Sequence, residues 1–164
     1  MFIREYDIRW SEIDANFHLT SAAYINYITD TRLAFFVENS FSFNEMKKYN
    51  LGPIVLSEKS FFFKEVFPND RIKCAICLHG MREDFSIITI EQRIFNASGQ
   101  NCYLAYTKIA FLDHRTRRIT SPNEELLDIL NKVPKSKDFK YYHAEEMKDK
   151  NAKPITFNEY IENG

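Results

Sequence analysis

The sequence contains little glycine, proline or cysteine. Its 164 residues include four glycines, five prolines and three cysteines. There is no glycine-rich phosphate loop and no Gly-x-Ser-x-Gly elbow, which argues against a nucleotide-binding fold and against a serine hydrolase. The cysteines Cys74, Cys77 and Cys102 are too few for a disulfide framework, and they favour a reducing, cytoplasmic setting.

The spacing Cys74-x-x-Cys77 is the one candidate redox or metal motif among the cysteines. It lies in residues 71–81, which have the pattern of a strand, so side chains three apart face opposite sides of a sheet. A redox pair needs both sulfurs together at a helix start, and a zinc site needs a second pair. We interpret both cysteines as buried bystanders, and we expect no metal and no cofactor.

The chain also lacks a strong net charge and a long hydrophobic run. A net charge of −1 leaves no electrostatic signature of nucleic-acid binding. No apolar run approaches the roughly 20 residues of a membrane span, and the first residues lack the regions of a signal peptide. A hydrophobic content of 45%, with 15% aromatic residues, instead predicts one folded domain with a sizeable core.

The first 36 residues predict a strand, a polar loop and a long helix. Residues 3–10 alternate as a half-buried strand does, and residues 22–36 have no glycine or proline. The side chains expected to face the core are Ile3, Tyr6, Ile8 and Trp10 on the strand and Ile25, Ile28, Leu33 and Phe36 on the helix. A polar loop between two rigid elements is a common place for chemistry.

Four extended segments and two short helices follow. The strands are expected at 54–67, 71–81, 85–95 and 101–113, and a short helix at 44–48. A second short helix should begin with Ser121 as N-cap and Pro122 in its first position. The charged residues 135–164 are predicted to be an extension of the domain at 1–134, with a helical turn near Glu145. This order favours an α+β fold, an antiparallel sheet around one long helix.

The loop resembles the signature of a known family. Trp10, Glu12, Asp14, His18, Tyr24 and Arg32 fall into the frame of hotdog-fold acyl-CoA thioesterases of the 4-hydroxybenzoyl-CoA thioesterase type. The resemblance covers residues 2–130. The family's Gly-His-Val-Asn-Asn is replaced here by Phe17-His18-Leu19-Thr20-Ser21, so the glycine and both asparagines are absent.

The resemblance implies a hotdog fold with about five strands, a homodimer or homotetramer, and hydrolysis of an acyl thioester on coenzyme A or acyl carrier protein. Asp14 matches the catalytic carboxylate, as general base or nucleophile, and His18 the residue that orients the loop or binds substrate. Backbone amides near residues 21–23 would stabilise the oxyanion. The substrate-binding residues expected are Thr20, Ser21, Ala22 and Tyr24, with Ser57 and Ser60 contributing across a dimer.

Several alternatives remain open at the level of sequence. Asp14 has the residue type of an ordinary turn, His18 that of a structural histidine, and Glu12 that of a solvated surface acid. A hotdog dehydratase, or a module that binds acyl thioesters without catalysis, would share the fold. A basic patch for coenzyme A phosphates would use Lys59, Lys64, Arg115, Arg117 and Arg118.

Overall fold

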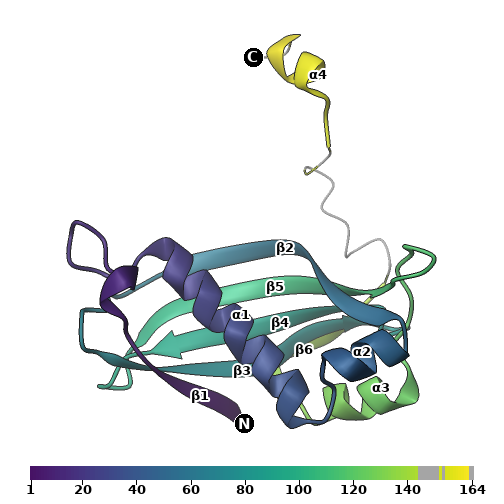
Figure 1. Cartoon of the computed structure of the whole chain (residues 1–164), viewed down its shortest axis with the longest axis horizontal. Helices are drawn as coiled ribbons and strands as arrows, with labels where there is room; N and C mark the ends of the chain where they lie inside the picture. The colour runs from purple at the N-terminus through teal and green to yellow at the C-terminus, as the bar shows by residue number, and fades with distance from the viewer. Residues whose placement is uncertain (144–151, 153, 163–164) are drawn as a thin grey trace.

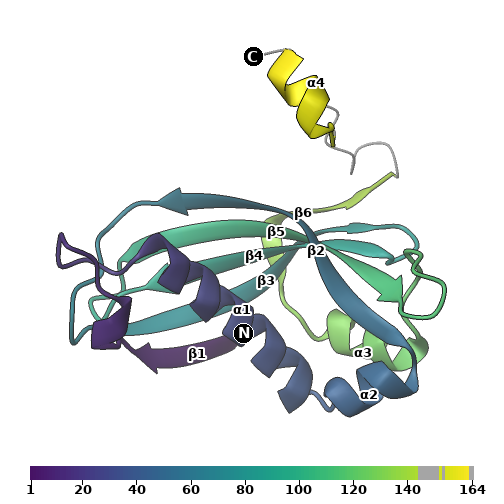
Figure 2. The same cartoon turned by 45° about the horizontal axis from the view of Figure 1, so that its top comes forward.

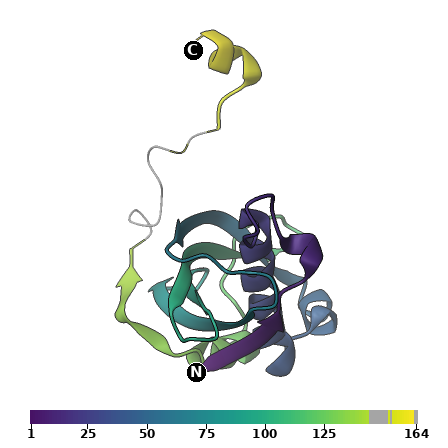
Figure 3. The ribbon, with the colours of Figure 1, turned by 90° about the vertical axis from the view of Figure 1, so that its left-hand side faces the viewer.

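The computed structural model describes residues 1–143, 152 and 154–162. An antiparallel sheet curves around the long helix α1 (Ser21–Glu38), as Figures 1 and 3 show. The strands of this sheet are β1 (Phe2–Asp7), β2 (Leu51–Phe62), β3 (Arg71–Arg82), β4 (Ile87–Phe95), β5 (Asn101–Asp113) and β6 (Lys135–Tyr142). Their order is β1-β3-β4-β5-β2, and β6 pairs with β3 in parallel. This arrangement is the hotdog fold, as predicted.

Helix α1 begins where the sequence supplies a cap. The Thr20 hydroxyl accepts a hydrogen bond from the Ala23 amide at 3.2 Å, which satisfies one of the free donors of the first turn. The side chains buried against the sheet are Ala23, Tyr24, Tyr27, Ile28, Thr31, Arg32, Phe35 and Phe36. The predictions for Ile25 on this helix and for Ile3 on β1 are wrong, because these side chains are 44% and 49% exposed. Tyrosine, threonine and arginine occupy the buried face, since their polar ends find partners there.

The sheet supplies the other half of the core. Ile88, Ile90 and Ile94 of β4 are at most 3% exposed, so alternate residues of this strand face the core. The hairpin between β4 and β5 turns at Gly99, whose φ of 75° is open to glycine at no steric cost. One buried cluster surrounds the first turns of α1, and a second lies near its end with the short helices.

The sheet edge formed by β3 is shared between two strands. β1 pairs with its first half, and β6 pairs with the half that follows. The predicted extension therefore begins with a strand of the sheet. Gly80 lies beneath the ring of Tyr142, and a Cβ at Gly80 would come within 2.0 Å of that ring. The helical turn expected near Glu145 lies outside the described residues, and helix α4 (Phe157–Glu162) comes later.

The short helices differ slightly from prediction. Helix α2 (Phe43–Lys48) forms as expected, with Ser42 and Glu45 as a capping box. Helix α3 (Glu124–Asn131) lies beside it in Figure 2, at the end of α1. Its N-cap is Asn123 rather than Ser121, because the Asn123 side chain accepts from the Leu126 amide at 3.2 Å.

Two further predictions concern the first strand and the cysteines. β1 ends at Asp7, and a turn of 3₁₀ helix follows at Trp10–Glu12, so the expectation of a half-buried Trp10 is wrong; its side chain is 70% exposed. Cys74 is buried as expected, whereas the expectation that Cys77 is buried is wrong, because this residue is partly exposed; both are free thiols. None of the helices that the structure describes is long and apolar enough to cross a membrane.

Candidate active site

The loop before α1 is held by main-chain hydrogen bonds. The Asp14 amide donates to the His18 carbonyl at 2.9 Å, and the Leu19 amide donates to the Val66 carbonyl at 2.8 Å. The Thr20 amide donates to the Glu12 carbonyl, also at 2.8 Å. These bonds join the loop to the 3₁₀ turn and to the segment after β2, so the loop has a defined conformation.

The Asp14 carboxylate is oriented by the same loop. Its Oδ1 accepts from the Asn16 amide at 2.8 Å and from the His18 amide at 3.1 Å. The hydrogen bond from the His18 amide, followed by that from Asn16, lowers the pKa of Asp14 below its usual value. Asp14 is exposed to solvent, so an ionised carboxylate of fixed orientation faces water.

Phe17 stands at the position of the family's glycine and has a backbone conformation that glycine adopts readily. Its φ is 63°, in the left-handed region that favours glycine. The ring is 71% exposed, so it packs little in return. The loop around Asp14 therefore contains a left-handed residue although no glycine stands there.

The start of α1 offers main-chain donors. The Ala23 amide is bonded to the hydroxyl and carbonyl of Thr20, so it is not available to a ligand. Within the described part of the chain, no acceptor is recorded for the amides of Ser21 and Ala22. Of the amides near residues 21–23 that were predicted to stabilise the oxyanion, those of Ser21 and Ala22 therefore remain as candidate donors.

A cavity of about 650 Å³ brings the loop and the helix start together with the end of β2. Its lining residues are Asp14, His18, Leu19, Ser21, Tyr24, Phe62, Phe63, Lys64 and Glu65. Four of the predicted catalytic and substrate-binding residues, together with Lys64 of the predicted basic patch, thus share one cavity. Phe62, Phe63 and Glu65 were not predicted. The run of three phenylalanines at 61–63 was the available signal, since exposed aromatic rings often mark a binding surface.

The backbone and the side chain of His18 have different partners. Its main chain holds Asp14, whereas its imidazole Nε2 lies 3.6 Å from the Glu65 carboxylate. The ring also packs edge-on against Phe67, with 5.2 Å between centroids. No direct contact joins the imidazole to the Asp14 carboxylate among the described interactions, so a catalytic dyad is not formed.

Tyr24 forms a buried wall of the cavity. Its ring stacks on Tyr103 at 4.9 Å and meets Phe62 edge-on at 5.4 Å. Its hydroxyl donates to the Lys64 carbonyl at 3.5 Å. Burial raises the pKa of Tyr24, so the hydroxyl stays neutral. The residue supports the segment after β2, and any contact with a ligand would come from its ring.

Glu12 has a structural partner. Its carboxylate accepts from the Tyr27 hydroxyl and from the Arg9 amide, the latter at 3.0 Å. Interpretation as a solvated surface acid is therefore wrong. The carboxylate ties the 3₁₀ turn to α1, so it fixes the start of the loop that carries Asp14.

The remaining predicted residues lie elsewhere. Thr20 caps the helix, Ala22 is exposed, and Ser57 is exposed on β2. The Ser60 hydroxyl shares a hydrogen bond of 2.7 Å with Tyr103. Neither serine lines the cavity that holds Asp14, so a contribution from them across a dimer stays a prediction.

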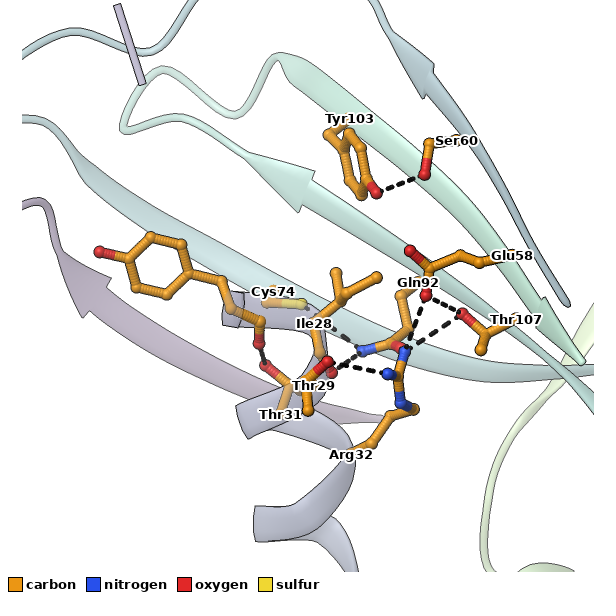
Figure 4. Close-up of polar contacts among 11 residues, drawn as sticks. Ile28, Thr29, Thr31, Arg32, Glu58, Ser60, Cys74, Gln92, Tyr103 and Thr107 are labelled. Carbon is orange, nitrogen blue, oxygen red and sulfur yellow. Dashed lines mark hydrogen bonds and ion pairs between the residues drawn. The ribbon is translucent and has the colours of Figure 1, made fainter. Parts of the chain in front are cut away.

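Arg32 forms a buried polar network between α1 and the sheet (Figure 4). Its Nη1 donates to Gln92 Oε1 at 2.9 Å and to Thr107 Oγ1 at 3.1 Å. The Glu58 carboxylate lies 3.6 Å from the same nitrogen. Burial lowers the pKa of Arg32, while the charge of Glu58 opposes this shift. These contacts give Arg32 a structural role between α1 and the sheet.

The basic residues proposed to bind the coenzyme A phosphates do not form one patch on a single copy of the protein. Lys64 lines the cavity beyond one end of β2, whereas Arg115, Arg117 and Arg118 follow Asp113, which pairs with Leu51 at the other end. The twelve residues of β2 separate the two groups by about 36 Å. Among the described residues, no group of three or more His, Cys, Asp or Glu side chains has the arrangement of a metal site.

Comparison with known proteins bears on this site. The sequence pattern of the thioesterase-like superfamily matches residues 8–130, which include the whole Asp14 loop and α1. The chain belongs to this superfamily. A search of curated proteins finds no match.

Solved structures share the fold at low identity. The probable thioesterase YbaW from Escherichia coli has a TM-score of 0.71 and 20% identity, over 82% of this chain and 100% of that one. The protein SAV2348 from Staphylococcus aureus, in complex with CoA, has a TM-score of 0.73 and 16% identity, over 82% and 87%. Slr0204, a 1,4-dihydroxy-2-naphthoyl-CoA thioesterase from Synechocystis, has a TM-score of 0.72 and 11% identity, over 80% and 96%.

Proposed function

We propose that the protein hydrolyses an acyl thioester, carried on coenzyme A or acyl carrier protein, at the Asp14 loop. The observation that carries this proposal is the juxtaposition of an oriented, ionised carboxylate with the open amides at the start of α1. Asp14 and Ser21 line one cavity large enough for an acyl thioester, and Ala22 follows Ser21 in the first turn of α1. The superfamily supports the class of reaction, and a structural relative in complex with CoA supports the carrier.

In the proposed mechanism, Asp14 acts on a water molecule beside the thioester carbonyl. The water oxygen forms a bond to the carbonyl carbon while its proton passes to the Asp14 carboxylate. The carbonyl oxygen becomes an oxyanion and accepts hydrogen bonds from the amides of Ser21 and Ala22. The carbon–sulfur bond then breaks, and the thiolate that leaves takes the proton from Asp14. In the alternative form of this mechanism, Asp14 attacks the carbonyl carbon itself, and the carbon–sulfur bond breaks to release the thiolate. Water then hydrolyses the resulting anhydride to the free acid and the Asp14 carboxylate, and the proton that this step releases passes to the thiolate.

We propose that the active assembly is a dimer or tetramer. Among the described residues β2 pairs only with β5, so its other edge offers main-chain groups to a second copy. Val55, Leu56 and Phe62 on β2 are 44–55% exposed, which adds apolar surface along the same strand.

The test is thiol release from a panel of short, long and aromatic acyl-CoAs by wild type and Asp14→Asn. Asp113→Asn is the matched control, because Asp113 Oδ1 also accepts two loop amides, from Arg115 at 2.8 Å and Thr116 at 2.7 Å. We expect Asp14→Asn to lose at least about a hundredfold in turnover, a size typical of general-base catalysis, and Asp113→Asn to keep it. Turnover unchanged in Asp14→Asn would contradict the assignment.

The alternatives give different results in the same assay. A module that only binds would retain acyl-CoA with no thiol release by wild type on any acyl-CoA or acyl carrier protein. A dehydratase would release water from a hydroxyacyl thioester and leave the carbon–sulfur bond intact.

A further inference from the structure

A second cavity, of about 420 Å³, lies between α1, α2 and the beginning of β2. Its wall is mostly apolar, with Leu33, Phe36, Met46, Val55 and Ile109 among the lining residues. The volume lies in the range of small-molecule sites. Lys47 and His114 are exposed lining residues, so the polar groups of the wall lie partly at its rim.

One lining residue is a buried cation. Arg32 is 7% exposed, yet it belongs to the wall of this apolar cavity. Its Nη1 donates hydrogen bonds to Gln92 and Thr107, and its Nη2 donates to Thr29 Oγ1 at 2.9 Å. A guanidinium has five N–H donors. Among the described residues no acceptor is recorded for its Nε, so the network of Figure 4 does not use the full donor set.

The charges around Arg32 restrict what a ligand could present. Glu58 already lies 3.6 Å from Nη1 and neutralises the guanidinium. An anionic group beside Arg32 would meet this carboxylate at close range in a medium of low dielectric constant, which is unfavourable. A neutral oxygen acceptor on an otherwise apolar ligand could accept a hydrogen bond from Arg32 without this repulsion from Glu58.

We propose that this cavity, here called the Arg32 cavity, binds the remote part of an acyl group that is apolar and carries a neutral oxygen, such as a hydroxyl or ketone, toward its far end. The identity of the ligand as an acyl group rests on the proposed function. Both cavities lie between α1 and β2, and Ser21 and Leu33 are separated by about 18 Å along α1. Short acyl groups would not span this distance within one chain.

The proposal is tested by binding without a thioester, so it is independent of turnover. The probes are dodecanoate and ω-hydroxydodecanoate, which differ only in the terminal hydroxyl. Affinities are measured by calorimetry, and two-dimensional ¹H–¹⁵N NMR maps the amides that shift. We expect the hydroxylated acid to bind about tenfold more tightly, as a hydrogen bond to a charged donor would give, with shifts at Leu33, Gly52 and Ile109.

Two variants separate the roles of charge and space. Arg32→Lys keeps a cation beside Glu58 but removes the planar set of donors, and it should reduce the preference to about twofold without weakening dodecanoate. Val55→Phe should fill the cavity and weaken both acids at least about tenfold. Equal affinities in wild type, an unchanged preference in Arg32→Lys, no binding of either acid, or shifts confined to the surroundings of Ser21 would each overturn the proposal. Failure of the thiol-release assay alone would overturn only the proposed hydrolysis.

Discussion

Phe17 is held in a left-handed backbone conformation, with φ of 63° and a ring that is 71% exposed. The bulky side chain gains little packing there, while the conformation costs about 1–2 kcal/mol for a residue with a Cβ. The reason for the conformation lies in the loop, where the Phe17 amide donates to the Asp14 carbonyl at 3.1 Å. The loop that orients the candidate carboxylate is therefore built at some cost in stability.

Phe17→Gly should stabilise the protein by up to about 1 kcal/mol, since glycine adopts positive φ without this penalty but is more flexible when unfolded. The measurement is urea denaturation of the variant beside wild type. Phe17→Ala is the control, because it removes the ring and keeps the Cβ. If Phe17→Ala stabilised the protein as much as Phe17→Gly, the exposed ring and not the left-handed backbone would be the cause of the lost stability.

The lowered pKa of Asp14 predicts the acidic limb of activity. Two loop amides stabilise the carboxylate, so its pKa in the folded protein lies below the ordinary value of about 3.9. The reactive carboxylate is thus present above that value, and its loss on acidification begins only as pH falls below it. The stability that these hydrogen bonds provide should fall over the same low range of pH.

In a profile of kcat/KM against pH, we therefore expect no decrease attributable to Asp14 between about pH 5 and 8. A decrease in kcat/KM between about pH 5 and 8 would contradict this account, because it would assign the essential titration to a group other than the Asp14 carboxylate.

At the scale of elements, α1 is joined to three strands through Arg32. Its partners Glu58, Gln92 and Thr107 lie on β2, β4 and β5. Gln92 also donates to the Ile28 carbonyl at 2.8 Å, so the network returns to the helix. Such a buried network fixes how a helix sits on a sheet when every member has a partner. The loop at the start of α1 then has a defined position over the end of β2.

Arg32→Ala should destabilise the fold by about 3–5 kcal/mol, because it leaves the Glu58 carboxylate without its cation. Glu58→Gln should cost less, since Glu58 is the more exposed partner. Thermal and urea denaturation measure both. If Arg32→Ala cost no more than a surface substitution, the network would have no structural importance.

The sequence predicted these elements where local chemistry decides the structure. Helix α2 and strands β3, β4 and β5 lie within two residues of the predicted ranges, because side-chain type and spacing decide them locally. Strand β6 was not predicted, because it is a charged edge strand without a clear period of two. The errors at Ile25 and Ser121 have a common reason: burial of polar residues and the choice between adjacent caps depend on tertiary partners.

The part of the candidate site that lies close together in the sequence was predictable, and the part contributed by a distant segment was not. Asp14, His18, Ser21 and Tyr24 lie within eleven residues of the signature, and one cavity joins them. Phe63 and Glu65 lie about forty residues later, so only the fold brings them to the loop. Which amides of α1 remain open also depends on the geometry of the Thr20 cap.

For the whole molecule, the edge of β2 that pairs with no strand among the described residues predicts self-association. Sedimentation should give a mass about twice that of the chain, or four times for a tetramer. Leu56→Lys places a charge on this edge and should yield monomer. Ile3→Lys is the control, because Ile3 has a similar exposure, 49% against 44%, on the opposite side of the sheet. A wild-type monomer would contradict the proposed assembly.

The central claim is that the Asp14 carboxylate performs thioester hydrolysis. The most direct measurement is the ratio of kcat between Asp14→Asn and Asp113→Asn on the best acyl-CoA of the panel, with binding of a non-hydrolysable acyl-CoA thioether measured for both. We predict that Asp14→Asn binds the thioether as Asp113→Asn does and turns over at least about a hundredfold more slowly. Equal turnover by the two variants would contradict the account.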